Sequence, residues 1–175
     1  MRRSMFAAGV LAGAAFLGLV GAGGLGVASA NASTAQPAAQ MAQRLIDGLK
    51  ATEGCLGVDA AQWQSGKNTI CAWFEDKKAV QRWYHSDTHA GVMGAVGADP
   101  EGRDPLQHVA DDEGPIMVMA TLEFNGPPAI KGSMIPFSMI SIELFKPLPG
   151  GAYVKDRLAP KGFKIEHMRN LTPKP

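Results

Sequence analysis

The feature that most constrains the fold is a ten-residue segment at 115–124 that is apolar on both faces. In an extended chain, successive side chains alternate between the two faces. One face of this segment carries Ile116, Val118, Ala120 and Leu122, and the other carries Met117, Met119 and Thr121. Such a pattern is typical of a central strand, so the chain needs a sheet that is covered on both sides.

The surrounding elements predict one α+β domain. Periodicity and turn residues indicate helices at 38–52, 77–85 and 87–96, strands at 55–63, 69–75 and 137–145, and a long loop at 97–114. This order favours a four-stranded antiparallel sheet with the helices on one face. Because helices on one face leave the other uncovered, the second apolar face of residues 115–124 predicts a homodimer.

The first thirty residues have the layout of an export signal. Arg2 and Arg3 precede a run without charge from Met5 to Ala28, and small-x-small sites follow at 28–30 and 30–32. We therefore expect a twin-arginine-like signal peptide at 1–30 and a linker at 31–37. The mature protein would be periplasmic or extracellular in a bacterium, without stable membrane insertion after cleavage. The alternative is an uncleaved N-terminal membrane anchor.

The balance of charge narrows the classes of partner. With 17 Lys+Arg against 16 Asp+Glu, the formal net charge is +1, which argues against a nucleic-acid partner.

A turn at 66–67 would place Cys55 and Cys71 seven positions apart along a hairpin, or ~23 Å. That separation is too long for a disulfide, so we expect two free, buried thiols, with a redox pair as the alternative.

Three segments carry a resemblance to a known family. They are Gly54-Cys55-Leu56-Gly57, Trp73-Phe74-Glu75-Asp76 and Ala79-Val80-Gln81-Arg82-Trp83-Tyr84-His85-Ser86-Asp87-Thr88-His89. Over about residues 40–124 the chain resembles the antibiotic biosynthesis monooxygenase (ABM) family. The resemblance implies a ferredoxin-like sandwich that dimerises into an α+β barrel, with the ABM-like domain at 38–146 and a C-terminal extension at 147–175.

The chain departs from this family at its beginning. The family starts with a strand before the first helix, whereas the residues before Ala38 show no strand pattern. We expect the strand at 137–145 to occupy the vacant central place, which gives a permuted sheet. The alternative is a position at the sheet edge, although edge strands usually carry charge or proline.

The resemblance also implies a substrate pocket. Trp83 occupies the position of a pocket tryptophan in the haem degraders of the family, and the substrate-binding candidates are Trp83, Tyr84, Trp73, Met93 and Met119. Met93 stands where those enzymes keep a haem-ligating histidine, so haem degradation by their mechanism is not expected. The alternative for Trp83 is a core position between helix and sheet.

The catalytic candidates are His85, His89 and Glu143. Two histidines four apart on a helix suit a general base or a metal, with a third ligand from His108, Asp111 or Asp112. The alternatives are solvated or hydrogen-bonded histidines and an exposed acidic turn at 111–113. Glu123 and Glu143 lie on apolar strands; a buried carboxylate could abstract a phenolic proton, whereas a solvent-facing charge would be inert.

Motifs for phosphate, dinucleotide or zinc binding are absent from the sequence, and we expect no cofactor. The favoured function is therefore an exported, cofactor-independent monooxygenase acting on a small aromatic or quinol substrate. The alternative is a non-catalytic binding module for a small hydrophobic ligand, haem or a metal. A purely structural dimer is the third hypothesis.

Overall fold

The computed structural model describes residues 28–97 and 106–174, with side chains from residue 39 onward. Most of the expected signal peptide (1–27), part of the expected loop (98–105) and Pro175 lie outside the described residues. Among the helices that are described, none is long and apolar enough to cross a membrane.

The elements from α1 to β4 follow the predicted order, and two short strands in the C-terminal extension, β5 and β6, were not predicted. The helices are α1 (Ala28–Ala51), α2 (Lys77–Tyr84) and α3 (Asp87–Val96), and the strands are β1 (Cys55–Gln62), β2 (Asn68–Phe74), β3 (Ile116–Glu123), β4 (Met139–Phe145), β5 (Ala152–Tyr153) and β6 (Arg169–Asn170). Helix α1 begins ten residues earlier than expected, so the residues predicted as a linker at 31–37 are helical. The candidate cleavage sites lie in its first turns. Gly54, with φ of +82°, reverses the chain between α1 and β1.

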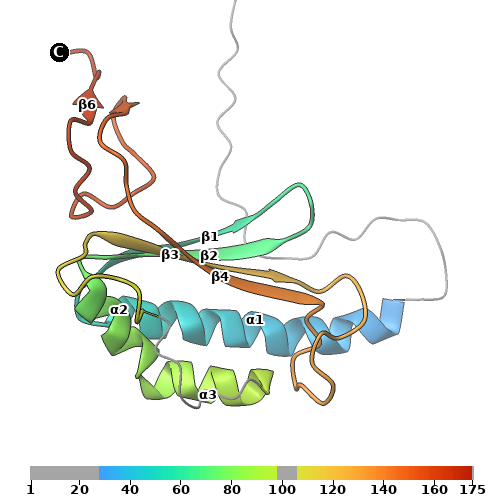
Figure 1. Ribbon diagram of the computed structural model, residues 1–175. Helices are drawn as coiled ribbons and strands as arrows, with labels where there is room; N and C mark the ends of the chain where they lie inside the picture. Colours follow the sequence, from blue (N-terminus) through green and yellow to red (C-terminus); the bar gives the residue numbers. More distant parts are fainter. Residues whose placement is uncertain (1–27, 98–105, 175) are drawn as a thin grey trace, which may run out of the picture.

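The four long strands form one antiparallel sheet in the order β1-β2-β3-β4, and the three helices lie on one of its faces (Figure 1). The predicted fold class, an α+β domain with a four-stranded antiparallel sheet, is confirmed. The expected place of the last strand is not. β3 pairs directly with β2, so β4 lies at the edge instead of in the centre. Strands that follow one another in the chain are usually neighbours in a sheet, and β3 and β4 follow this rule across the connection at 124–138.

The helices cover the sheet through one apolar core. Its buried members are Leu49, Ile70, Ala72, Phe74, Ala79, Val80, Trp83, Leu106 and Ile116. The caps predicted from the sequence hold the two short helices in place: Asp76 Oδ1 accepts from Ala79 N at 2.8 Å, and Ser86 Oγ accepts from His89 N at 3.2 Å. A smaller cluster, Ala95, Val96, Ile135 and Phe137, joins the end of α3 to the loop before β4.

The hairpin confirms the free thiols and corrects their register. Both cysteines are free, and both are half-buried instead of buried as expected. Cys71 pairs with Asp59, not with Gln62 as expected, because Trp63 N donates to Lys67 O at 2.9 Å and moves the turn toward Ser65. Cys55 is four positions from Asp59, about 13 Å along the strand, which is still too far for a disulfide.

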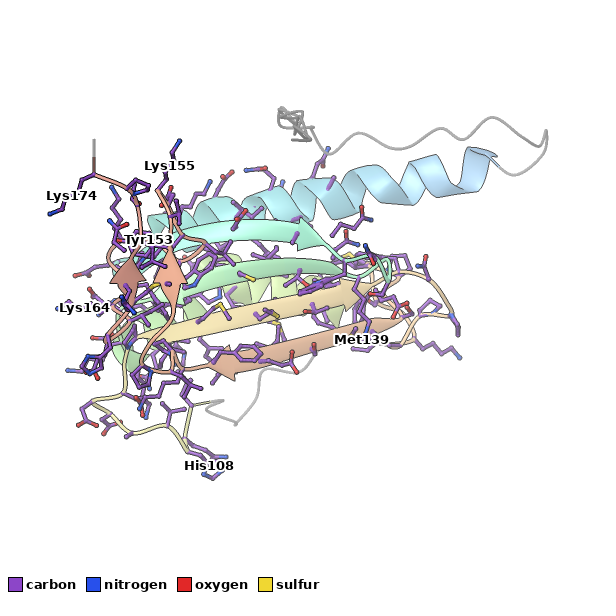
Figure 2. All side chains as sticks on the ribbon, turned by 90° about the horizontal axis from the view of Figure 1, so that it is seen from above. His108, Met139, Tyr153, Lys155, Lys164 and Lys174 are labelled. Carbon is purple, nitrogen blue, oxygen red and sulfur yellow. The ribbon has the colours of Figure 1, made fainter. Side chains whose placement is uncertain are left out.

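The C-terminal extension covers one end of the second sheet face. Arg157 holds it together, because its Nη2 donates to the carbonyl oxygens of Pro160, Lys161 and Phe163 at 2.8–2.9 Å. Pro160 lies so close to Gly57 on β1 that a Cβ added there would be 2.5 Å from Pro160 Cγ. Figure 2, which looks onto the face away from the helices, shows this segment over one end of the sheet.

Candidate functional site

The sheet divides the predicted site residues into two groups. Trp83, Tyr84, His85, His89 and Met93 come from the helices and the junction between them, whereas Trp73, Met119 and Glu143 come from the strands. Ile70, Ala72 and Phe74 of β2 belong to the helix-side core, so the alternating Trp73 points to the opposite face, and the register places Met119 and Glu143 there too. We call this opposite side the open face. Glu143 and His89 therefore cannot act on one bound molecule.

On the helix side, Trp83 is a core residue. It is 8% exposed and belongs to the main buried cluster. A Cβ added at Gly48 of α1 would be 3.1 Å from Trp83 Cζ3, so the α1 backbone packs directly on the indole. This contact supports the core alternative and leaves little of the ring for a ligand.

The two histidines do not share one helix face. His85 is the C-cap of α2, and His89 lies in the first turn of α3, because the chain changes direction at Ser86. Both rings contact Tyr84, at centroid distances of 5.1 Å for His85 and 4.9 Å for His89. His89 also meets Trp83 edge to face at 5.6 Å. The geometry of two histidines four apart on a continuous helix is lost.

His89 is held in its neutral form by its surroundings. Burial lowers the pKa of the half-buried imidazole, and nearby His85 lowers it further, although a hydrogen bond with the Tyr84 backbone acts in the opposite direction. At neutral pH the ring can therefore accept a proton.

The acidic loop has a structural role. Asp111 Oδ1 accepts from the buried Lys77 Nζ at 2.8 Å, and Lys77 also donates to Val109 O at 2.7 Å. The Lys77 hydrogen bond lowers the pKa of Asp111. Glu113 pairs with Lys146 at 2.7 Å. In the part of the chain that the structure describes, no group of three potential ligands gathers around a metal position.

On the open face, the pair Glu123 and Met139 lies at the end of β3 and β4 nearest the β1–β2 turn, and three rows of side chains cross the whole sheet. From the β1–β2 turn toward the C-terminal extension they are Ala61, Thr69, Thr121 and Ser141; Asp59, Cys71, Met119 and Glu143; and Gly57, Trp73, Met117 and Phe145. The extension lies on Gly57, and Trp73 in the same row is buried. Asp59 and Glu143 are exposed at the two ends of the middle row, and Cys71 and Met119 are half-buried between them.

Trp63, which the sequence analysis did not select, is the most distinctive residue of this face. Its indole is 51% exposed, yet Nε1 donates to Thr69 Oγ1 at 2.6 Å. Thr69 is buried and shares a 3.0 Å hydrogen bond with Thr121. The ring is thus fixed against the sheet with much of its surface in solvent. A tryptophan six positions before a strand threonine, across a tight turn, is the sequence signal that could have indicated it.

Both thiols have raised pKa values. Burial raises the pKa of Cys55, and burial together with the charge of Asp59 raises the pKa of Cys71. Cys55 packs against the helix-side core, whereas Cys71 lies on the open face. The two cysteines therefore report on different sides of the sheet.

Comparisons with family models, curated proteins and solved structures found no match to this chain.

Proposed function

We propose that this protein is an exported binding module for a small, flat, apolar ligand, and that the ligand lies on the open face against Trp63. The observation that carries this proposal is the fixed, half-exposed indole. Its hydrogen bond to Thr69 orients the ring before any ligand arrives, so that stacking requires little additional ordering. A surface aromatic ring without such a hydrogen bond would have to be ordered when the ligand binds, at a cost in binding free energy.

The centre of the open face, two residues along β2 from the Thr69 that holds Trp63, suits an apolar ligand, and Glu123 lies at the turn end of the same face. Met119 and Cys71 are half-buried, polarisable side chains in the centre of the face, and Met117 lies in the following row. The charged groups of the middle row, Asp59 and Glu143, lie at its ends. A flat aromatic molecule or a quinol can contact the centre without placing a charge in an apolar environment.

The resemblance to the ABM family is part of this proposal. A ferredoxin-like sandwich of that family combines an antiparallel sheet with helices on one face, and the observed α+β architecture is compatible with it. Export rests on the paired arginines and the run without charge that follows them. A role without catalysis is favoured because the sheet separates Glu143 from His89.

The test uses the two cysteines as matched reporters. Saturation with a fused-ring aromatic that does not react with thiols, such as 2-naphthol, should slow alkylation of Cys71 and leave that of Cys55 unchanged. Mass spectrometry of the peptides measures both rates in one sample. Equal rates with and without 2-naphthol, or equal protection of both thiols, would contradict binding on the open face.

The variant Trp63→Ala should weaken 2-naphthol binding about 2- to 10-fold, because a stacked aromatic pair contributes ~0.5–1.5 kcal/mol beyond its area burial. The matched control is Trp83→Phe, which changes a tryptophan on the helix side and should leave the affinity unchanged. If Trp83→Phe weakens binding and Trp63→Ala does not, the ligand lies among the helices.

A second candidate, the cofactor-independent monooxygenase, is favoured by one observation: the neutral His89 imidazole beside Trp83 and Tyr84. Such an enzyme would use His89 to remove a proton from a hydroquinone, and the resulting anion would react with O2. The binding-module proposal expects no O2 consumption above the uncatalysed rate with a hydroquinone panel. Consumption that His89→Gln abolishes would favour the enzyme.

A further inference from the structure

The two edges of the sheet differ in how they present their backbone. At the β1 edge the register shifts between Cys55 and Gly57, and Asp59 Oδ1 accepts from Ala60 N at 2.8 Å. A bulge and an aspartate that occupies a backbone donor are devices that discourage another strand from pairing. The β1 edge is thus protected.

The β4 edge has none of these devices. Its seven residues, 139–145, contain no glycine, proline or lysine, and the register against β3 is continuous. In the described residues, β4 pairs with β3 alone, so its outer backbone groups face away from the sheet. The residue after the strand, Lys146, is engaged by Glu113. Glu143 is the one charged residue of β4, and an edge of this length without a bulge or proline is a template for another strand.

The apolar side chains of β4 are also uncovered. Ile140, Ile142 and Leu144 share the helix-side face with Leu122, Ala120 and Val118 of β3. They are nevertheless 37%, 60% and 39% exposed. The first helix, α1, lies toward the β1 side, far from β4, as Figure 2 shows. Soluble monomers seldom leave such a contiguous stripe in water.

We propose that β4 pairs antiparallel with β4 of a second copy of this chain, across a two-fold axis at Ile142, to form one continuous eight-stranded sheet. In this register Ile142 lies opposite the partner's Ile142, and Ile140 lies opposite the partner's Leu144. On the open face, Ser141 lies opposite the partner's Glu143. Every member of β4 then has a partner residue of compatible chemistry.

Charge selects this register over its neighbours. In an antiparallel pair of strands related by a two-fold axis normal to the sheet, each residue lies opposite a residue whose side chain is on the same face. The axis must therefore pass through a residue, and the alternative registers place it at a neighbouring residue. An axis at Glu143 would place two carboxylates directly opposite each other, which is destabilising. An axis at Ser141 would shorten the paired segment from seven residues to five. Ile142 alone avoids both losses.

This interface goes beyond the proposed function and does not depend on it. The pairing extends the sheet sideways and leaves Trp63, Cys71 and Met119 accessible on the open face. The dimer expected from the sequence was to cover that face; here the contact is the edge. Since one pair of strands buries less area than a typical permanent interface, we expect dissociation on the order of micromolar concentration.

Substitutions at Ser141 test the register in both directions. Ser141→Lys places an opposite charge across from the partner's Glu143 twice per dimer and should tighten the dimer about 2- to 30-fold. Ser141→Glu should weaken it by a similar factor, and Ser141→Glu with Glu143→Lys should restore it. Sedimentation equilibrium measures the dissociation constant, and circular dichroism checks that each variant folds. Because Ser141→Lys should lower the dissociation constant of the dimer, unfolding of a variant cannot produce the same result.

Cysteine cross-linking tests the position of the axis. Under mild oxidation Ile142→Cys should form a dimer linked through residue 142, since directly opposite Cβ atoms lie ~4.5–5.5 Å apart. The matched control, Ile140→Cys, should not, because its two copies would be separated by four positions along the strands. A protein that stays monomeric at tens of micromolar, or a dimer whose dissociation constant is the same in all Ser141 variants, would overturn the proposal.

Discussion

Alternate side chains of β2 meet two different kinds of cover. On the helix side, Ile70, Ala72 and Phe74 enter one continuous core built with α1 and α2. On the open face, Trp73 is buried in the row where the C-terminal extension lies, and Thr69 is buried beneath Trp63. Between these two patches, Cys71 remains half-buried.

This difference separates the side of the sheet that carries the main core from the side on which we propose that a ligand binds. Over β2 the helix side is closed by apolar contacts with α1 and α2, whereas the helix-side side chains of the edge strand β4 remain exposed. Among the described residues, the C-terminal extension and Trp63 cover the two ends of the open face, and Cys71 and Met119 in its centre remain half-buried. The following predictions test that contrast, beginning with the largest effect.

Removal of a core ring from the helix side should destabilise the whole fold. Phe74→Ala deletes a side chain with 0% exposure, and we expect a loss of ~3–5 kcal/mol in the free energy of unfolding. Urea denaturation measures it. The control is Leu158→Ala in the exposed extension, which should change stability by less than about 0.5 kcal/mol. Similar losses in both variants would remove the distinction between the two sides.

Crowding beneath the extension should release it from the sheet. Gly57→Ala would place a Cβ 2.5 Å from Pro160 Cγ, and overpacking of this kind costs ~1–3 kcal/mol. We expect faster tryptic cleavage after Lys161 and Lys164. The matched control is Gly91→Ala, where an added Cβ meets nothing within 4 Å. Unchanged cleavage in Gly57→Ala would show that the extension does not depend on this contact.

Loss of the Trp63 hydrogen bond should lower the free energy of unfolding by a smaller amount. Trp63→Phe keeps an aromatic ring but loses the bond to Thr69, which we expect to cost ~0.5–1.5 kcal/mol. Thr69→Val should cost more, because it also leaves the buried Thr121 hydroxyl without this partner. Thermal denaturation of both single variants and the double variant gives the coupling energy. A coupling energy of zero would contradict a fixed indole.

The smallest effect is a pH dependence from His89. Because burial lowers its pKa in the folded state, the unfolded chain binds the proton first as the pH falls below about 6.5. Stability should therefore decrease from pH 7.5 toward the lowered pKa and then level off. Urea denaturation across this range measures the slope. His89→Gln should reduce it, and an identical slope in the variant would assign the effect to other groups.

Several parts of this structure could be predicted because their signals are local. The spacing of Leu45 and Leu49, the caps at Asp76 and Ser86, and the doubly apolar segment at 116–123 each depend on near neighbours in the chain. The free thiols were predicted correctly despite a register error of three residues, since either register keeps the sulfurs apart.

The candidate site was less predictable because it depends on which face of the sheet each side chain occupies. Trp83 lies in an aromatic-rich motif, but whether its ring meets a ligand or α1 is decided by the approach of Gly48. Glu143 and His89 were joined in one hypothesis, and only the register of β3 and β4 places them on opposite sides of the sheet. Trp63 was missed because its importance comes from Thr69 across the turn.

By itself, the sequence determined the elements, their order and the need for cover on both sides of the central strand, because side-chain alternation and capping act over a few residues. The tertiary structure decided that β3 pairs directly with β2, that β4 becomes the edge, and that the chain's own C-terminal extension supplies part of the second cover. These outcomes depend on contacts between residues distant in the chain, which the periodicity of a short segment does not specify.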